Sequence, residues 1–137
     1  MMSSTQIQKF QLESQLDSLA KIESIVDELK EQYLIPEDIY GNILVAVTEA
    51  VNNAIRHGNK LDPSKKVDFS FEPTEKDFIF KIQDKGTGFN PDLIPDPTLA
   101  ENLDKPDGRG IFIMKNLSDE VAFEDEGRRV EISFNRS

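Results

Sequence analysis

The chain has 137 residues and no cysteine, with 37% hydrophobic and 31% charged residues, which predicts one soluble domain over residues 1–137 without disulfides or thiolate sites. The 16 basic and 26 acidic residues give a formal net charge of -10, which disfavours binding to nucleic acids and acidic membranes. No apolar run has the length of a signal peptide or a membrane span, so we expect a cytoplasmic protein with no direct nucleic-acid or membrane contact.

A strand and two helices are predicted in the first part of the chain. Apolar residues partly alternate over residues 5–12, which indicates a strand, and Ser14 is a suitable N-cap after it. Apolar residues recur at three- and four-residue steps over 16–33 and again over 36–57. The second helix has a proline at its expected first position and Gly58 as its expected C-cap.

Two hairpins and a short helix complete the predicted elements. Alternating apolar residues predict paired strands at 67–71 and 78–82, and again at 121–123 and 130–134, with a helix over 110–117 between the pairs. This order predicts an α+β protein, a two-layer α/β sandwich. Its mostly antiparallel mixed sheet is covered on one face by helices.

The segment between Lys85 and Asp107 shows no regular periodicity and holds four of the seven prolines. A loop of this length inside a small domain is usually functional, and it commonly closes over a ligand. We therefore expect a lid in this part of the chain.

Three polar residues lie four positions apart on the second helix. Glu49, Asn53 and His57 therefore project from nearly one face. The face is either an ordinary solvated one or a site in which a carboxylate and a carboxamide hold a hard cation and activate a hydroxyl. For His57 a structural role at the helix end is the favoured interpretation.

Two glycine-containing motifs follow. Asp84 continues the alternation of a strand and should point into the buried layer, where it is either a turn residue or an acceptor for a ligand amine. Gly86 and Gly88 let the backbone approach such a ligand closely. Gly108 and Gly110 begin a helix, where free amides can bind an anion such as phosphate, or they are ordinary loop glycines.

The order of these motifs is more specific than any one of them. Glu-x-x-x-Asn on a helix, Asp-x-Gly-x-Gly after a strand, a long loop and Gly-x-Gly at a helix start occur in sequence. The chain resembles the Bergerat-fold ATP-binding superfamily, which includes gyrase and the catalytic domains of histidine kinases. Within it the chain is most similar to the stand-alone anti-sigma-factor serine kinases, over about residues 5–134.

The resemblance implies a role for each polar residue. Asn53 would supply a side-chain oxygen to Mg²⁺, which bridges the triphosphate of ATP, and Glu49 would be the general base. Asp84 would accept the adenine amino group, with Gly86 and Gly88 shaping the wall beside the base. Such roles suit phosphoryl transfer, which depends mainly on positioning and charge neutralisation.

By the same resemblance, Gly108 and Gly110 would present amides to the phosphates, and residues 89–107 would be the ATP lid. Arg109 departs from the family pattern, because many members have an apolar residue between these glycines. The arginine would contact the phosphates, face a protein partner or be solvated.

The resemblance implies a Mg²⁺- and ATP-dependent serine/threonine kinase that phosphorylates a STAS-type anti-anti-sigma protein, sequesters a sigma factor and forms a homodimer. Two alternatives stay open. One is an ATP-binding regulatory module of the same fold without kinase activity, and the other is an interaction protein that binds no nucleotide.

Overall fold

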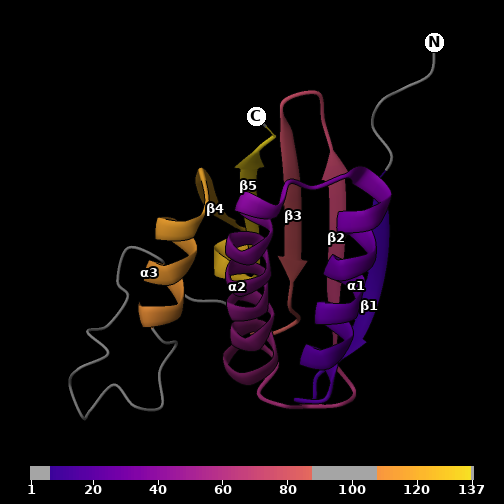
Figure 1. Cartoon of the computed structure of the whole chain (residues 1–137). Helices are drawn as coiled ribbons and strands as arrows, with labels where there is room; N and C mark the ends of the chain where they lie inside the picture. Colours follow the sequence, from indigo (N-terminus) through magenta and orange to yellow (C-terminus); the bar gives the residue numbers. More distant parts are fainter. Residues whose placement is uncertain (1–6, 88–107, 137) are drawn as a thin grey trace.

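The computed structural model describes residues 7–87 and 108–136, in which three α-helices lie on one face of a five-stranded sheet (Figure 1). This arrangement confirms the predicted two-layer α+β sandwich. The elements in chain order are β1 (Gln8–Glu13), α1 (Ser18–Tyr33), α2 (Glu37–Asn53), the π-helical turn η1 (Ala54–Gly58), β2 (Lys66–Pro73), β3 (Asp77–Gln83), α3 (Gly108–Leu117), β4 (Glu120–Glu124), the 3-10 turn η4 (Asp125–Gly127) and β5 (Arg129–Asn135).

The strand order in the sheet is β1-β2-β3-β5-β4. All four strand pairs in the described ranges are antiparallel, so the expectation of a mixed sheet was wrong. The cause lies in the connection between β1 and β2. Two helices rather than one separate these strands, so the chain returns to the end where β1 stopped and β2 runs in the opposite direction (Figure 1).

The core lies between the sheet and the helices. Alternate residues of β2 and β3 are buried, as their apolar alternation predicts. The rings of Phe71 and Phe80 on these strands have centroids 5.1 Å apart, and Phe80 meets Phe134 of β5 edge-on. Buried stripes of α1 and α2 cover these rings, through Ile22, Val26, Leu29, Ile43, Ala46, Val47, Ala50 and Val51.

The starts of the first two helices differ from the predictions. Helix α1 begins at Ser18 after Asp17, because the side chain of Ser14 is buried and donates instead to the backbone carbonyl of Lys65. Pro36 is the N-cap of α2 rather than its first helical residue, with an extended ψ of 143°. None of the helices in the described ranges is long and apolar enough to cross a membrane.

Candidate functional site

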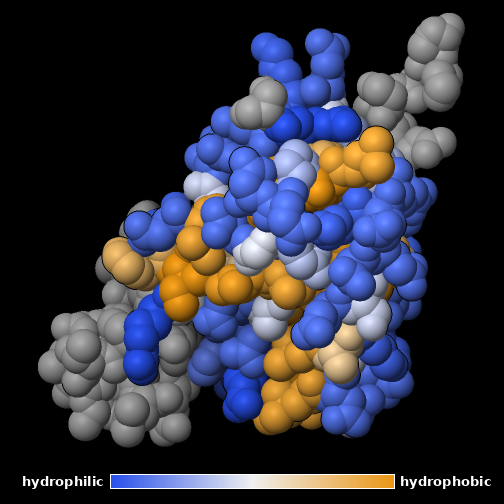
Figure 2. Space-filling model, viewed as in Figure 1, coloured by the Kyte–Doolittle hydropathy of each residue, from blue (hydrophilic) through white to orange (hydrophobic). Residues whose placement is uncertain are grey.

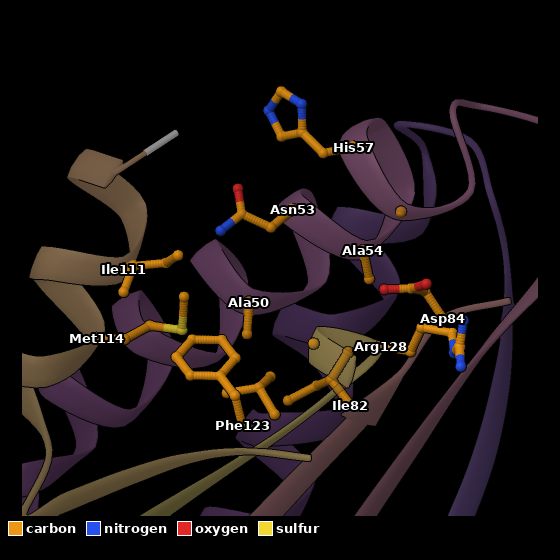
Figure 3. Close-up of a pocket in the computed structure, with 13 residues that line it drawn as sticks. Ala50, Asn53, Ala54, His57, Ile82, Asp84, Ile111, Met114, Phe123 and Arg128 are labelled. Atoms are coloured by element: carbon orange, nitrogen blue, oxygen red, sulfur yellow. The ribbon is translucent and has the colours of Figure 1, made fainter. Parts of the chain in front are cut away.

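A pocket opens where the end of α2 and the turn η1 face the end of β3 (Figure 3). Asp84 and Arg128 lie together at one end of it. Asn53 and His57 line it from α2 and η1, and apolar side chains of α2, η1, α3 and the strands form the rest of the wall. The enclosed space is about 50 Å³, less than the several hundred Å³ of typical ligand pockets. It therefore suits the edge of one flat ring, with the remainder of a larger ligand outside it. The apolar residues lining it are Ala50, Ala54, Ile82, Ile111, Met114, Phe123 and Val130.

The carboxylate of Asp84 is only 8% exposed, as the alternation of β3 predicts. Its Oδ1 accepts a hydrogen bond of 2.8 Å from the Gly86 amide, so the residue does form an Asp-x-Gly turn. Within the described part of the chain no donor is bound to Oδ2. The turn therefore uses one carboxylate oxygen and leaves the second able to accept a hydrogen bond from a ligand.

Burial raises the pKa of the Asp84 carboxyl, because desolvation disfavours the charged form. The Gly86 amide and the nearby positive charge of Arg128 offset only part of this effect. A buried acceptor that is kept despite this electrostatic cost is a candidate binding residue.

Gly58 and Gly86 allow the end of η1 to contact the Asp84 turn directly. A Cβ on Gly58 would lie 2.4 Å from the Asp84 carboxyl carbon, and a Cβ on Gly86 would lie 2.0 Å from the Gly58 carbonyl oxygen. Only glycine fits at either position. Gly86 is thus placed beside Asp84 as expected, whereas Gly58 is a site residue that the sequence analysis missed, having assigned it to a C-cap.

The predicted C-cap role of Gly58 was wrong for a local reason. The chain after Asn53 continues as a π-helical turn, and Asn59 donates its amide to the Ala54 carbonyl at 2.8 Å. The π-helical turn ends at Gly58 with Asn59 as its C-cap, and Gly58 lies against Asp84. Single π-turns are often found at functional sites.

The helix motif and the Gly-x-Gly motif meet across α2 and α3. A Cβ on Gly110 would lie 3.2 Å from Asn53 Nδ2 and 3.5 Å from Glu49 Oε1. The start of α3 therefore lies directly against these two polar side chains. Gly108 begins the helix and Arg109 is exposed, while Gly88 and the expected lid over 89–107 lie outside the described residues.

Two further residues, His57 and Arg128, line the pocket although neither was predicted as a site residue. His57, assigned a structural role, is half-buried and lines the pocket. Arg128 follows a turn in which Asp125, Glu126 and Gly127 all have positive φ. The guanidinium of Arg128 lies 3.4 Å from Asp125 Oδ1. The positive φ angles of the non-glycine residues Asp125 and Glu126 strain this turn. In the sequence, the glycine at position 127 indicates a turn but does not reveal this strain.

The arrangement has two chemically different ends. Asp84 and the apolar wall suit a flat heterocycle with an amino group, and the start of α3 with Asn53 and Glu49 suits an anionic group with its cation. In residues 7–87 and 108–136 no three His, Asp or Glu side chains come together as a metal site. The oxygen donors of Asn53 and Glu49 suit a hard cation that obtains most of its ligands from the bound anion.

Comparison with known proteins shows what the sequence of the chain is similar to. The profile of the histidine kinase-like ATPase domain matches residues 12–134. The anti-sigma F factor of Geobacillus thermodenitrificans (strain NG80-2) is 33% identical over 111 residues, which are 79% of this chain and 68% of that protein. The anti-sigma F factor of Geobacillus kaustophilus (strain HTA426) is 33% identical over 112 residues, with the same coverage.

The fold comparison agrees with these matches. A crystal structure of the RsbU and RsbW domains of a Mycobacterium tuberculosis protein superimposes with a TM-score of 0.67 at 12% identity. The match covers 96% of this chain and 32% of that solved chain, so this chain spans about a third of it. This likeness supports the fold.

Gly58→Ala should lower the free energy of unfolding by about 1–3 kcal/mol, because the added methyl group collides with Asp84. The Asp84 Cβ is itself only 2.8 Å away, so rotating the carboxylate does not relieve the contact. Gly41→Ala is the matched control, since nothing lies within 4 Å of its Cβ position on α2. Urea unfolding should show the control to be up to about 1 kcal/mol more stable than wild type. Equal stability of the two variants would contradict the close packing at Gly58.

Asp84→Asn should stabilise the ligand-free protein at neutral pH. The folded-state pKa of Asp84 lies above its unfolded value of about 3.9, so ionisation destabilises the folded wild type as pH rises through that window. The variant keeps an acceptor for the Gly86 amide and cannot ionise. Urea unfolding at several pH values should show the smallest difference at about pH 3 and a growing advantage of the variant up to a plateau. A difference that does not change with pH would refute the raised pKa.

Proposed function

Because the chain belongs to the histidine kinase-like ATPase domain family, in the group that contains the anti-sigma F factors, we propose that it is a Mg²⁺- and ATP-dependent serine/threonine protein kinase. Its substrate in this proposal is a STAS-type anti-anti-sigma protein, and it also sequesters a sigma factor. The observation that carries the proposal is the convergence of Asp84, Asn53, Glu49 and Gly110 around one pocket and its rim.

The base of ATP binds at the Asp84 end of the pocket in this proposal. Oδ1 of Asp84 is occupied by the Gly86 amide, so Oδ2 accepts the hydrogen bond from the adenine amino group. Ile82, Met114 and Phe123 supply apolar contacts to the faces of the ring. Gly86 and Gly88 provide the wall beside the base.

The phosphates bind at the start of α3. Amides of Gly108 and Gly110 face the anion, and Arg109 adds a charged donor. Asn53 would supply the protein oxygen to Mg²⁺, and the bound ion would neutralise charge on the phosphates. The proposal also assigns the role of a lid over the nucleotide to residues 89–107, which lie outside the described residues.

Glu49 is the general base in this proposal. Gly110 lies against both Glu49 and Asn53, so the carboxylate stands beside the amides assigned to the phosphates. There it takes the proton of the attacking Ser or Thr hydroxyl as that oxygen bonds to the γ-phosphorus and ADP leaves. In this role Glu49 only accepts a proton, and it forms no covalent bond to the phosphoryl group.

The helix-bearing face supports a protein partner near this centre. Figure 2 shows apolar patches on a largely hydrophilic face. Val45 lies one turn before Glu49 and is 45% exposed, and Phe112 on α3 is 67% exposed. Exposed apolar groups beside a reaction centre suit a protein substrate. The net charge of -10 suits a basic sigma factor, and a homodimer is part of the proposal.

Glu49→Gln should bind MgATP with an affinity within about twofold of wild type but lose phosphoryl transfer by about 10²–10⁴-fold. The amide keeps the size of the side chain and cannot accept the proton. The test is transfer of labelled γ-phosphate to the STAS-type protein that a MgATP-dependent pull-down retains, with Glu75→Gln in the exposed turn between β2 and β3 as the control. Normal transfer by Glu49→Gln would remove Glu49 as the base. ATP binding without transfer by the wild type would replace the kinase with an ATP-binding regulatory module.

Asp84→Asn should weaken ATP binding by about 100-fold. The Asn Oδ1 takes the bond from the Gly86 amide, so its Nδ2 donor faces the adenine amino group, which is also a donor. Calorimetric titration with MgATP measures the effect, and Asp77→Asn at the start of β3 is the control carboxylate outside the pocket. Unchanged affinity of Asp84→Asn would exclude Asp84 from the base site.

A further inference from the structure

The residue that follows the η1 turn, Asn59, is a buried polar side chain with every hydrogen-bonding group satisfied. It is 1% exposed. Its Oδ1 accepts from the Lys85 amide at 2.7 Å, and its Nδ2 donates to Ser14 Oγ at 2.8 Å. Nδ2 also lies 3.2 Å from the backbone carbonyls of Lys65 and Lys66. Because the Lys85 amide can only donate and the carbonyls can only accept, the orientation of the carboxamide is fixed.

One end of this side chain acts on the turn that carries Asp84. Three successive amides of the turn have fixed acceptors: the Asp84 amide bonds to the Arg128 carbonyl at 2.8 Å, and the Gly86 amide bonds to Asp84 Oδ1 at 2.8 Å. The amide between them, that of Lys85, bonds to Asn59 Oδ1. Rotation of this peptide unit would swing the Asp84 carboxylate, so the Asn59 oxygen fixes the direction in which Asp84 points.

The other end of the side chain is held by separate elements. Ser14 belongs to the junction of β1 and α1, and Lys65 precedes β2. The backbone of Asn59 is fixed as well, since its carbonyl accepts from the Asp62 amide at 3.0 Å. Lys60 and Leu61 between them have φ values of 53° and 59°, which non-glycine residues keep only where the surroundings enforce them.

We propose that Asn59 is a positioning residue for base recognition, which aims Asp84 Oδ2 into the pocket through its hydrogen bond to the Lys85 amide. This role rests on the proposed nucleotide function. The two ends of the side chain have different tasks: the Oδ1 bond sets ligand affinity, and the Nδ2 bonds contribute to stability.

The test separates these two ends with three variants. Asn59→Ala removes both, and Asn59→Asp keeps an acceptor for Lys85 but loses the donors. Ser14→Ala removes one partner of Nδ2, together with the hydrogen bond from Ser14 to the Lys65 carbonyl, and leaves the Oδ1 bond in place. Calorimetry with MgATP is carried out where urea unfolding shows each variant to be folded. Hydrogen exchange of the Lys85 amide is measured without ligand. If Asn59→Ala does not fold, Asn59→Ser takes its place, since its hydroxyl is too short to reach the Lys85 amide.

We expect Asn59→Ala to bind ATP about tenfold more weakly and to lose protection of the Lys85 amide. Ser14→Ala and Asn59→Asp should be less stable but bind ATP within about threefold of wild type. If Asn59→Ala binds MgATP with wild-type affinity, or if Ser14→Ala loses as much MgATP affinity as Asn59→Ala, the positioning role is overturned. Either result leaves the proposed function standing. Failure of the wild type to bind MgATP would instead overturn the proposed function, and the positioning role with it.

Discussion

The pocket depends on the close approach of the α2 end to the turn after β3. A Cβ on Gly86 would lie 2.0 Å from the Gly58 carbonyl oxygen, so the two backbones are in direct contact. This contact places Asp84 beneath the helix end, and the same helix carries Asn53 and Glu49 toward α3. Larger residues at the two glycines would push the Asp84 turn away from the end of η1. The distance between Asp84 and the polar residues Asn53 and Glu49 is therefore set by backbone packing rather than by long side chains.

A second constraint is electrostatic. The chain has a net charge of -10, yet the proposed ligand is an anion. The start of α3 offers backbone amides that carry partial positive charge without adding a basic residue to the surface. The two acidic residues of the site have different surroundings. Asp84 is buried and its pKa is raised, whereas Glu49 is half-buried against Gly110. Keeping a carboxylate buried reduces stability, which is the usual exchange of stability for binding at a functional site.

Much of the architecture follows from periodicity in the sequence. The alternation in β2 and β3 predicted both the hairpin and the burial of Asp84, because a period of two fixes the face on which each residue lies. The roles of Ser14 and Gly58 were not predictable in this way. Each has a local pattern typical of a helix cap, but tertiary contacts with Lys65 and Asp84 decide where they lie. Arg128 was missed because its place in the pocket depends on a strained turn that periodicity does not reveal.

The buried network around Asn59 connects segments that are far apart in the sequence. Ser14, Asn59 and Lys85 are joined by hydrogen bonds, so the β1–α1 junction, the end of η1 and the turn that carries Asp84 are held together. A fully satisfied polar network of this kind specifies a single arrangement, because any shift leaves a buried group without a partner. The geometry of Asp84 is consequently tied to the first strand and helix of the chain.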